Sequence, residues 1–325
     1  MAPSQFVSHC TIDALKSAAN LLKTGGLVAF PTETVYGLGA DAENESAVAR
    51  IYEVKGRPAN HPLIVHIGDW QLMGDWVSEV PDYAIDLARS FWPGPMTLVM
   101  KRSELAKDFI TGGQDTVGIR VPDRPVALQL LTDFSKVGGK GIAAPSANRF
   151  GQVSPTTAQA VREEIGDFLN ESDQIIDEGP CAVGIESTII DCSGDHPKIL
   201  RPGAITEEMI TAATGLSVGQ SDNSIRVSGS LEAHYAPIAK VILDGAAGYG
   251  DGFIALAEIP TPPGAIRLAS PKNNEAYAKD LYSALRSGDA QGVEKIIAIT
   301  PKGHGIAIAI RDRLQRAAVG SAGGI

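Results

Sequence analysis

The stretch LVAFPTETVYGLGADA, from Leu27 to Ala42, joins a short apolar run to a cluster of hydroxyl and carboxylate side chains. The run Leu27–Phe30 has the length and composition of a buried strand. A helix is predicted before it, because apolar residues recur at helical spacing from Ile12 to Leu22. The polar cluster that follows the strand is typical of a functional site or of a turn with a capping threonine. The stretch therefore predicts an α/β fold with polar groups at a strand end.

Similar patterns predict further strands and helices as far as residue 213. Their order is too irregular for a repeated strand–helix–strand unit, so we expect a mixed sheet with helices packed against it. The predicted strands are Leu63–Ile67, Met96–Lys101, Val117–Val121, Gly141–Ala144, Gln174–Asp177, Ser187–Asp191 and Lys198–Arg201, and the predicted helices are Glu45–Val54, Tyr83–Phe91, Pro125–Leu131, Thr157–Ile165 and Thr206–Ala213.

A change of composition divides the chain. Gly, Ser, Asn and Asp predominate from Thr214 to Pro237, which is typical of a linker. Beyond it, short strands alternate with the helical segments Asn274–Ser287 and Gly303–Ala318, so a small parallel α/β domain is predicted. We therefore predict a first domain over residues 1–213, a linker over 214–237 and a second domain over 238–325. The strands predicted in the second domain are Ala239–Leu243, Gly252–Ala257, Ala265–Leu268 and Lys295–Ile299.

Composition excludes several classes of protein. The chain has 28 Lys and Arg against 38 Asp and Glu, a net charge of −10, which disfavours broad electrostatic capture of nucleic acid. Its three cysteines form no C-x-x-C pair, which suits a reducing compartment and argues against structural zinc. The pattern of a signal peptide is missing, and no apolar run approaches the roughly 18 residues of a membrane span. We expect a soluble cytoplasmic protein.

Polar and cationic residues gather near the predicted strand ends, although P-loop, G-x-S-x-G and H-E-x-x-H motifs are absent. The motif KGRP can direct two cations at phosphates, or it can be a solvated helix end. Arg120, in a predicted buried strand, needs an anionic partner, either internal or bound. His66, also within a strand, is more simply a core residue. Together the clusters predict one concave site for an anionic, phosphate-bearing substrate. They are Thr32–Thr34, Lys55–Arg57, Arg120, Ser146–Asn148, Ser187 and Arg201.

The order of these motifs resembles the threonylcarbamoyl-adenylate synthase family over nearly all of residues 12–210. The motifs are PTETVYGLGADA, KGRP with PLIVHI, FWPGPMTLV, TVGIRVPDRP, APSANRFGQVSPT, and GIESTIID with ILRPGAI. SGSLEAHYAP, from Ser228 to Pro237, followed by a small domain is similar to the two-domain Sua5 members of that family. The resemblance implies a YrdC-like catalytic domain with a twisted mixed sheet, a linker crossing the active site, and a small Rossmann-like α/β C-terminal domain.

The resemblance also implies an activity. Members of the family are nucleotidyltransferases that convert L-threonine, bicarbonate and ATP to threonylcarbamoyl-AMP and pyrophosphate. This is the first step towards N6-threonylcarbamoyladenosine at position 37 of tRNA. A separate downstream transferase then modifies the tRNA, and a weak direct contact with tRNA is left open. We expect Mg²⁺ to be held through the ATP phosphates, with no metal site built from protein ligands.

Site residues follow from the resemblance position by position. The signature tetrad, taken as catalytic, corresponds to Lys55, Arg57, Ser146 and Asn148. These four, with His61, Thr116, Ser154, Arg201 and Tyr235, are expected to bind ATP, and Thr34, His66, Arg120 and Ser187 are expected to bind threonine. His61 stands where the family usually has Asn or Lys, which leaves its contribution open. Glu33, Glu186 or solvent could accept protons from the substrate amine.

The sequence is also compatible with two other classes of protein. Carbamoyl-transferring hydrogenase maturation proteins share the catalytic fold, but they carry zinc-finger C-x-x-C pairs that this sequence lacks. A non-catalytic RNA-binding module is the second alternative, and the negative charge argues against it. A salt-dependent affinity for RNA would favour it.

Overall fold

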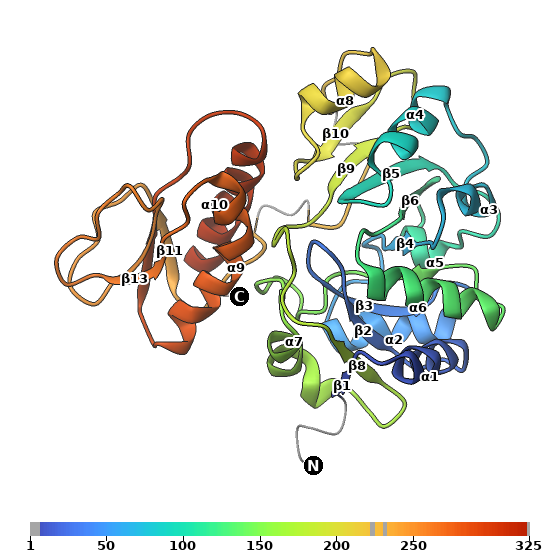
Figure 1. The fold of residues 1–325 in the computed structure, drawn as a ribbon, viewed down its shortest axis with the longest axis horizontal. Coiled ribbons are helices and arrows are strands. Elements are labelled where there is room, and N and C mark those ends of the chain that lie inside the picture. Colours follow the sequence, from blue (N-terminus) through green and yellow to red (C-terminus); the bar gives the residue numbers. More distant parts are fainter. Residues whose placement is uncertain (1–6, 222–224, 230–232, 324–325) are drawn as a thin grey trace.

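The computed structural model describes residues 7–221, 225–229 and 233–323. Strands in these residues form two separate sheets, one of ten strands and one of four. Figure 1 shows the larger sheet with its helices on one side of the molecule and the smaller sheet, with α9 (Asn274–Ala290) and α10 (Ile306–Ala322), on the other. We call this second unit, Lys240 to Ala322, the C-terminal domain.

The larger sheet is mixed, as predicted. Some neighbouring strands run parallel and others antiparallel. From one edge to the other the strands are β1 (Val7–His9), β8 (Gln174–Asp177), β2 (Val28–Pro31), β3 (Tyr36–Asp41), β7 (Ile142–Ala143), β4 (Ile64–His66), β6 (Thr116–Arg120), β5 (Met96–Lys101), β9 (Thr188–Asp191) and β10 (Lys198–Arg201).

Helices cover both faces of this sheet because its central strands are apolar on both sides. In β2, Val28 and Phe30 pack on one face with α1 (Ile12–Lys23) and α6 (Pro125–Lys136). Ala29 packs on the other face with α2 (Glu45–Lys55) and α7 (Ala158–Ile165). The remaining helices of this unit are α3 (Met73–Trp76), α4 (Asp82–Phe91), α5 (Asp108–Thr111) and α8 (Glu207–Thr214), with single 3₁₀ turns at Trp70–Leu72 and Gly166–Phe168.

The segment after β2 differs from its predicted structure. The sequence predicted a polar cluster after the first strand and no further strand there, but Tyr36–Asp41 forms β3, which pairs antiparallel with β2. Glycines lower strand propensity, and they conceal this strand in the sequence. The fold requires one of them, because a Cβ at Gly39 would lie 2.7 Å from Cγ2 of Ile142 and 2.9 Å from Cε1 of Phe30. Only Thr32–Val35 remains a turn that carries polar groups into the molecule.

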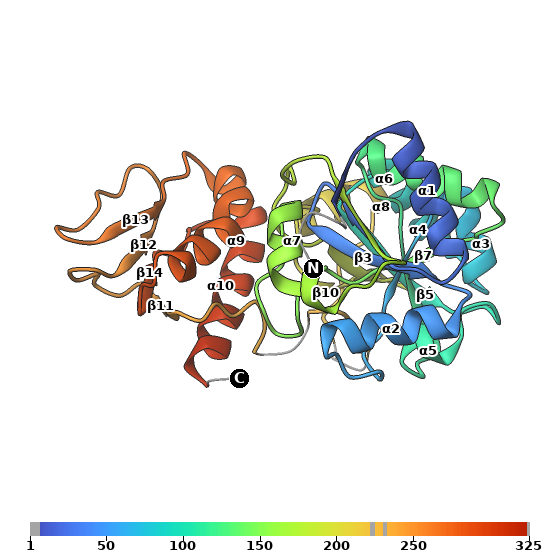
Figure 2. The ribbon, with the colours of Figure 1, turned by 90° about the horizontal axis from the view of Figure 1, so that it is seen from below.

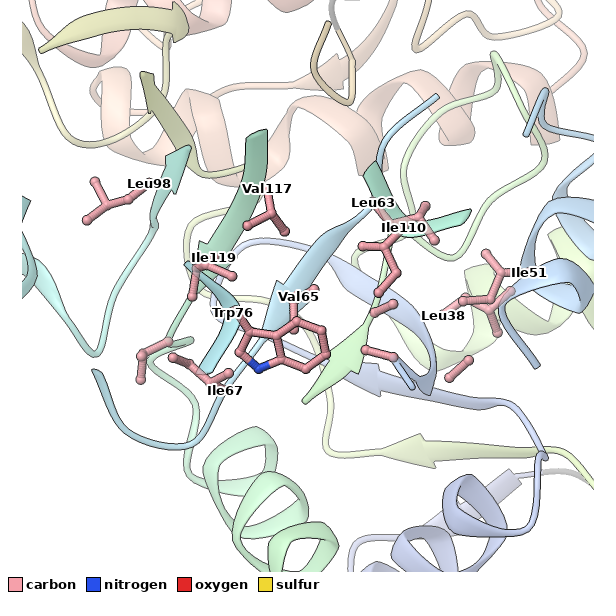
Figure 3. Packing of buried hydrophobic residues seen from close by; sticks show 14 of the residues in the cluster. Leu38, Ile51, Leu63, Val65, Ile67, Trp76, Leu98, Ile110, Val117 and Ile119 are labelled. Atoms are coloured by element: carbon pink, nitrogen blue, oxygen red, sulfur yellow. The ribbon is translucent and has the colours of Figure 1, made fainter. Parts of the chain in front are cut away.

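The largest core cluster fixes the middle of the sheet. Trp76 of α3 is fully buried, and its indole lies among Val65, Ile67 and Ile119, which come from β4, the residue after it and β6 (Figure 3). Because the strands that carry the predicted polar residues share this core, their ends are held rigidly with respect to one another.

The C-terminal domain is a parallel α/β unit, which confirms the predicted fold class. Its strands lie in the order β11 (Lys240–Leu243), β14 (Lys295–Ala298), β12 (Gly252–Ile254) and β13 (Ile266–Ala269), all parallel. In both ribbon views α9 and α10 lie between this sheet and the larger unit (Figures 1 and 2). Arg286 of α9 forms an ion pair of 2.9 Å with Glu164 of α7, so the two units are in direct contact.

Most predicted elements are present, with ends shifted by a few residues. Helix α6 extends beyond the predicted Leu131 to Lys136, because Phe134 continues its buried face. Helices α9 and α10 likewise run past their predicted ends. Among the described residues no helix combines the length and the hydrophobicity required to cross a membrane.

Candidate active site

One cavity collects most of the predicted site residues. Its floor comes from the turn after β2, from β4 and β6, and from the segment that follows β7. Described parts of the predicted linker, at residues 228–229 and 234–235, close it. The lining residues are Thr32, Val35, Gly37, Arg57, Ile64, His66, Arg120, Ala144, Pro145, Ser146, Glu186, Ser187, Arg201, Ser228, Gly229, His234 and Tyr235.

Two buried guanidiniums dominate one part of the cavity. Arg57 donates to the carbonyl of Pro62 at 2.9 Å and to Oγ of Ser228 at 3.1 Å. Arg201 donates to the carbonyls of Ser228 at 2.8 Å and Ser187 at 2.9 Å. Burial lowers the pKa of Arg57 to about 10, so it stays charged at neutral pH. Within the described residues neither arginine pairs with a carboxylate, a setting that suits an anionic ligand.

The other two members of the predicted tetrad shape the loop that bears Ser146. Nζ of Lys55 donates to the carbonyl of Ser146 at 2.6 Å and to that of Asn148. The amide of Asn148 donates to the carbonyls of Arg149 at 2.7 Å and Gln152 at 2.8 Å. Burial, together with the charge of Arg57, lowers the pKa of Lys55 well below its usual range. In this structure Lys55 and Asn148 therefore lie behind the cavity, while Arg57 and Ser146 line it.

A second set of polar groups surrounds Arg120. Its Nη2 donates to Oε1 of Glu33 at 2.6 Å and to Oγ1 of Thr34 at 2.9 Å. The partner of this buried arginine is thus an internal carboxylate, one of the two possibilities raised by the sequence. Among the described residues Nε of Arg120 has no hydrogen-bond partner, so donor capacity is left for a ligand. The other Glu33 oxygen accepts from the backbone N–H of Asp123 at 2.9 Å.

Two further predicted threonine-binding residues line the same wall. Burial and the charge of Arg120 lower the pKa of His66 to about 3, so its ring is neutral at pH 7. Oγ of Ser187 lies 2.8 Å from Oγ1 of Thr97, and it also accepts from Arg201 at 3.2 Å. Ser187 is thus held by Thr97 and by Arg201 in the cavity wall.

Besides Lys55 and Asn148, three further residues predicted to bind ATP lie near the cavity without lining it. Thr116 lines an adjoining, more apolar cavity with Ile64, Val99, Ile189 and Val227. Oγ of Ser154 donates to Oε1 of Glu186 at 2.6 Å. His61 is partly exposed, and its ring meets that of Phe150 edge to face at 5.3 Å. The predicted residues thus lie in one region of the structure, but only some of them line the cavity.

The linker contributes aromatic rings. The Phe150 ring meets that of His234 at 6.1 Å, and His234 meets Tyr235 at 4.2 Å. Nδ1 of His234 accepts from the backbone N–H of Tyr235 at 3.0 Å. Burial lowers the pKa of His234 to about 3, so this ring is also neutral at pH 7. Described linker residues therefore bring two aromatic rings into the cavity that the arginines line, and the carbonyl of Ser228 accepts from Arg201.

Neither of the two predicted proton acceptors is an unpaired carboxylate. Glu33 pairs with Arg120, and Glu186 pairs with Arg313 of the C-terminal domain. Burial would raise the pKa of Glu186, but Arg313, Arg201 and Ser154 outweigh it and hold the pKa at about 2. The sequence analysis did not single out Ser228 or Arg313. Their contacts with cavity residues form only because the linker and the C-terminal domain pack against the larger unit.

Two family models together match most of the chain. Residues 20–203 match the Sua5/YciO/YrdC family model, described as "Telomere recombination". Residues 205–319 match the model described as "Threonylcarbamoyl-AMP synthase, C-terminal domain". The chain is 40% identical to a threonylcarbamoyl-AMP synthase of Pyrococcus abyssi over 93% of each chain. It is 39% identical to one of Bacillus subtilis, over 94% of this chain and 93% of that one.

A solved structure shares the whole architecture. The structure of Sua5 from P. abyssi in complex with L-threonine superposes with a TM-score of 0.86. The two chains are 36% identical, and the superposition covers 97% of this chain and 98% of the other. The similarity therefore spans both sheets and the segment between them.

Proposed function

This chain belongs to the threonylcarbamoyl-AMP synthase family, and we propose that it joins L-threonine, bicarbonate and ATP to give threonylcarbamoyl-AMP and pyrophosphate. One observation of the cavity supports the proposal most strongly. Within the part of the chain that the structure describes, Arg57 and Arg201 are buried there without carboxylate partners, and the same cavity is lined by a third arginine, Arg120, that does pair with a carboxylate. Such a cavity suits a substrate with phosphates and a second substrate with its own carboxylate.

Threonine is proposed to bind at Arg120. The unpartnered Nε of this guanidinium can donate to the substrate carboxylate, while Glu33 and Thr34 hold the group in position. The hydroxyl of Ser187 and the neutral ring of His66 can orient the amino acid. The amine then attacks the carbon of bicarbonate, forming a C–N bond and releasing water, to give the carbamate.

ATP is proposed to bind at Arg57 and Arg201. A carbamate oxygen attacks the α-phosphorus, the bond between this phosphorus and the bridging oxygen breaks, and pyrophosphate leaves. The two guanidiniums stabilise the charge that develops on the phosphate oxygens. Lys55 is proposed to act by holding the carbonyls of Ser146 and Asn148, which fixes the loop against the nucleotide. No protein nucleophile takes part.

Mg²⁺ is proposed to enter with ATP. The described residues contain no cluster of three His, Cys, Asp or Glu side chains placed to hold a metal. Glu186, the carboxylate that lines the cavity, accepts from Ser154, Tyr282 and Arg313. Water and ATP phosphates are the ligands that Mg²⁺ usually retains in such sites.

The product is proposed to serve tRNA modification. We propose that a separate transferase receives threonylcarbamoyl-AMP and modifies the tRNA, and that any direct contact of this chain with tRNA is weak, since its net charge is −10. A reducing cytoplasmic location is also proposed, and the free thiols of Cys10, Cys181 and Cys192 are consistent with it.

Pyrophosphate release tests the proposal. The chain is incubated with ATP and Mg²⁺, with and without threonine and bicarbonate, and the product mass is measured before it hydrolyses. We expect release that requires both co-substrates and is much weaker with serine. Folded protein that binds ATP but releases no pyrophosphate under any combination would contradict the proposal, and a salt-dependent affinity for RNA would then be measured.

A further inference from the structure

Glu186 is a carboxylate of the cavity wall that is held largely from the C-terminal domain. Oε1 accepts from Ser154 at 2.6 Å. Oε2 accepts from the hydroxyl of Tyr282 in α9 at 2.8 Å and from Nε of Arg313 in α10 at 2.9 Å. Tyr282 and Arg313 lie 96 and 127 residues along the chain from Glu186. The C-terminal domain therefore reaches the cavity wall directly.

Both of these side chains are entirely buried, with relative exposures of 0%. A buried guanidinium is tolerated only when its donors are satisfied. Arg313 also donates to the carbonyl of Pro202 at 3.0 Å and to Asp312. The donations to Glu186 and Pro202 fix Arg313 relative to the larger unit, and the donation to Asp312 fixes it within α10.

The same two side chains hold Tyr235. Its ring stacks on Tyr282 with centroids 5.6 Å apart and planes at 29°, and the guanidinium of Arg313 lies 5.4 Å from its centroid. The backbone of Tyr235 has φ of +60°, a left-handed conformation that a tyrosine adopts only when its surroundings impose it. Tyr235 is thus held from behind by the C-terminal domain.

The hydroxyl of Tyr235 is available to a ligand in the cavity. Tyr235 is 1% exposed and lines the cavity, and its hydroxyl has no hydrogen-bond partner among the described residues. A buried hydroxyl without a partner costs free energy unless a ligand completes it. Neither Tyr282 nor Arg313 lines the cavity, so they reach a ligand only through Tyr235 and Glu186.

We propose that Tyr282 and Arg313 are positioning residues through which the C-terminal domain sets Glu186 and Tyr235 in the nucleotide site. The proposal rests on the proposed function in taking ATP as the ligand of this part of the cavity. Loss of either donation to Glu186 displaces this carboxylate from its place in the cavity wall, and loss of the ring contacts lets Tyr235 leave its left-handed backbone conformation. Either change weakens ATP binding. Threonine, at Arg120 and Glu33, is affected far less.

Tyr282→Phe is the principal test, because it removes the hydroxyl and keeps the ring that stacks on Tyr235. Tyr277→Phe is the matched control. Tyr277 is also 0% exposed and in α9, and its hydroxyl donates instead to the carbonyl of Ile299 at 3.1 Å, outside the cavity. Each substitution removes one buried hydroxyl from the same helix, so a general loss of stability is common to both.

Equilibrium binding of ATP, the KM for each substrate and the midpoint of thermal unfolding are measured for both variants. We expect Tyr282→Phe to weaken ATP binding by about five- to tenfold and to raise the KM for ATP similarly, with the KM for threonine within about twofold. Tyr277→Phe should leave both constants within about twofold. Equal effects of the two variants on ATP binding, or none from Tyr282→Phe, would overturn the proposal.

A second variant tests the ion pair. Arg313→Lys keeps the charge but cannot supply the three separate donations of a guanidinium, so we expect it to weaken ATP binding at least as much as Tyr282→Phe. Binding as tight as in the unaltered chain would contradict the role of Arg313. An unaltered chain that binds ATP but forms no pyrophosphate would sink the proposed function alone, since the binding comparison still decides the positioning roles.

Discussion

Nη2 of Arg120 lies 2.6 Å from Oε1 of Glu33, and both side chains are buried beneath the cavity. Removing one partner of such a buried ion pair destabilises the folded protein, because the other charge is then buried without compensation. The same arginine lines the cavity, and its Nε has no hydrogen-bond partner among the described residues. The pair therefore supports the cavity wall as well as the fold.

Replacing the guanidinium of Arg120 by an ammonium group should weaken the binding of threonine and leave the binding of ATP nearly unchanged. We predict that Arg120→Lys raises the KM for threonine at least about tenfold, because lysine cannot donate to Glu33 and to a substrate carboxylate in the same planar geometry. Equilibrium binding of ATP should change by less than about twofold. Steady-state kinetics with each substrate varied in turn checks this. A rise confined to the KM for ATP would show that Arg120 serves the nucleotide instead.

Substitution of Arg57 should instead weaken the binding of ATP and leave the binding of threonine nearly unchanged. We predict that Arg57→Ala weakens ATP binding by roughly 10- to 100-fold, the usual range for a lost charge-assisted hydrogen bond, and that Arg57→Lys recovers part of it. Titration calorimetry with ATP measures the effect. Threonine affinity, measured without ATP, is the internal control, and its loss in parallel would indicate general unfolding.

The close approach of the linker to the cavity can be tested by substituting Gly229. Gly229 has φ of +78°, and a Cβ there would lie 2.1 Å from the hydroxyl of Tyr235 and 3.1 Å from Nη1 of Arg201. We therefore predict that Gly229→Ala lowers kcat/KM for ATP more than about tenfold. Gly215→Ala is the control, since φ is +70° and nothing lies within 4 Å of its Cβ. Similar kinetics for the two variants would mean that backbone strain, not the contact, matters.

Stability should fall on acidification through buried histidines. The pKa of His66 is lowered from 6.5 to about 3, so between these values the unfolded chain binds a proton that the folded chain excludes. The free energy of unfolding therefore decreases as pH falls through this window, by about 1.4 kcal/mol per pH unit for one such group. We predict that His66→Gln reduces the slope by about this amount.

Urea unfolding followed by circular dichroism at pH 5.0, 5.5 and 6.0 measures the slope. His234, whose pKa is also lowered to about 3, remains in the variant, so the slope should diminish but persist. His196→Gln, at an exposed position, supplies the control substitution. An unchanged slope in His66→Gln would mean that the ring is already charged in the folded protein.

Most of the fold could be predicted from the sequence, because the spacing of apolar residues indicates which side chains are buried and hence whether a segment is a helix or a strand. Met96–Lys101 and Gln174–Asp177 are strands whose bounds agree with the structure, since each is a short apolar run with polar neighbours. Strand β3 was missed because Gly37 and Gly39 occupy places where other side chains approach the backbone. No local pattern reveals such a close approach.

The site was predicted in part. Motif order located Arg57, Arg120, Ser146 and Arg201, and the structure places all four along one cavity. The positions of Lys55 and Asn148 behind the loop depend on which way each side chain turns, which spacing does not report. The contacts of Glu186 with Tyr282 and Arg313 depend on the packing of two domains, and nothing in either segment alone indicates the other.

The order of strands in the larger sheet has a consequence for synthesis on the ribosome. Strand β2 lies between β3, its neighbour in sequence, and β8, and the backbone N–H of Leu27 donates to Asp173, 146 residues further on. The hairpin of β2 and β3 can form early, but one of its edges stays unpaired until β8 has emerged. An unpaired edge invites pairing with other chains. While the segment between Asp41 and Asp173 is translated, the edge of β2 that later pairs with β8 is therefore open to pairing with other chains.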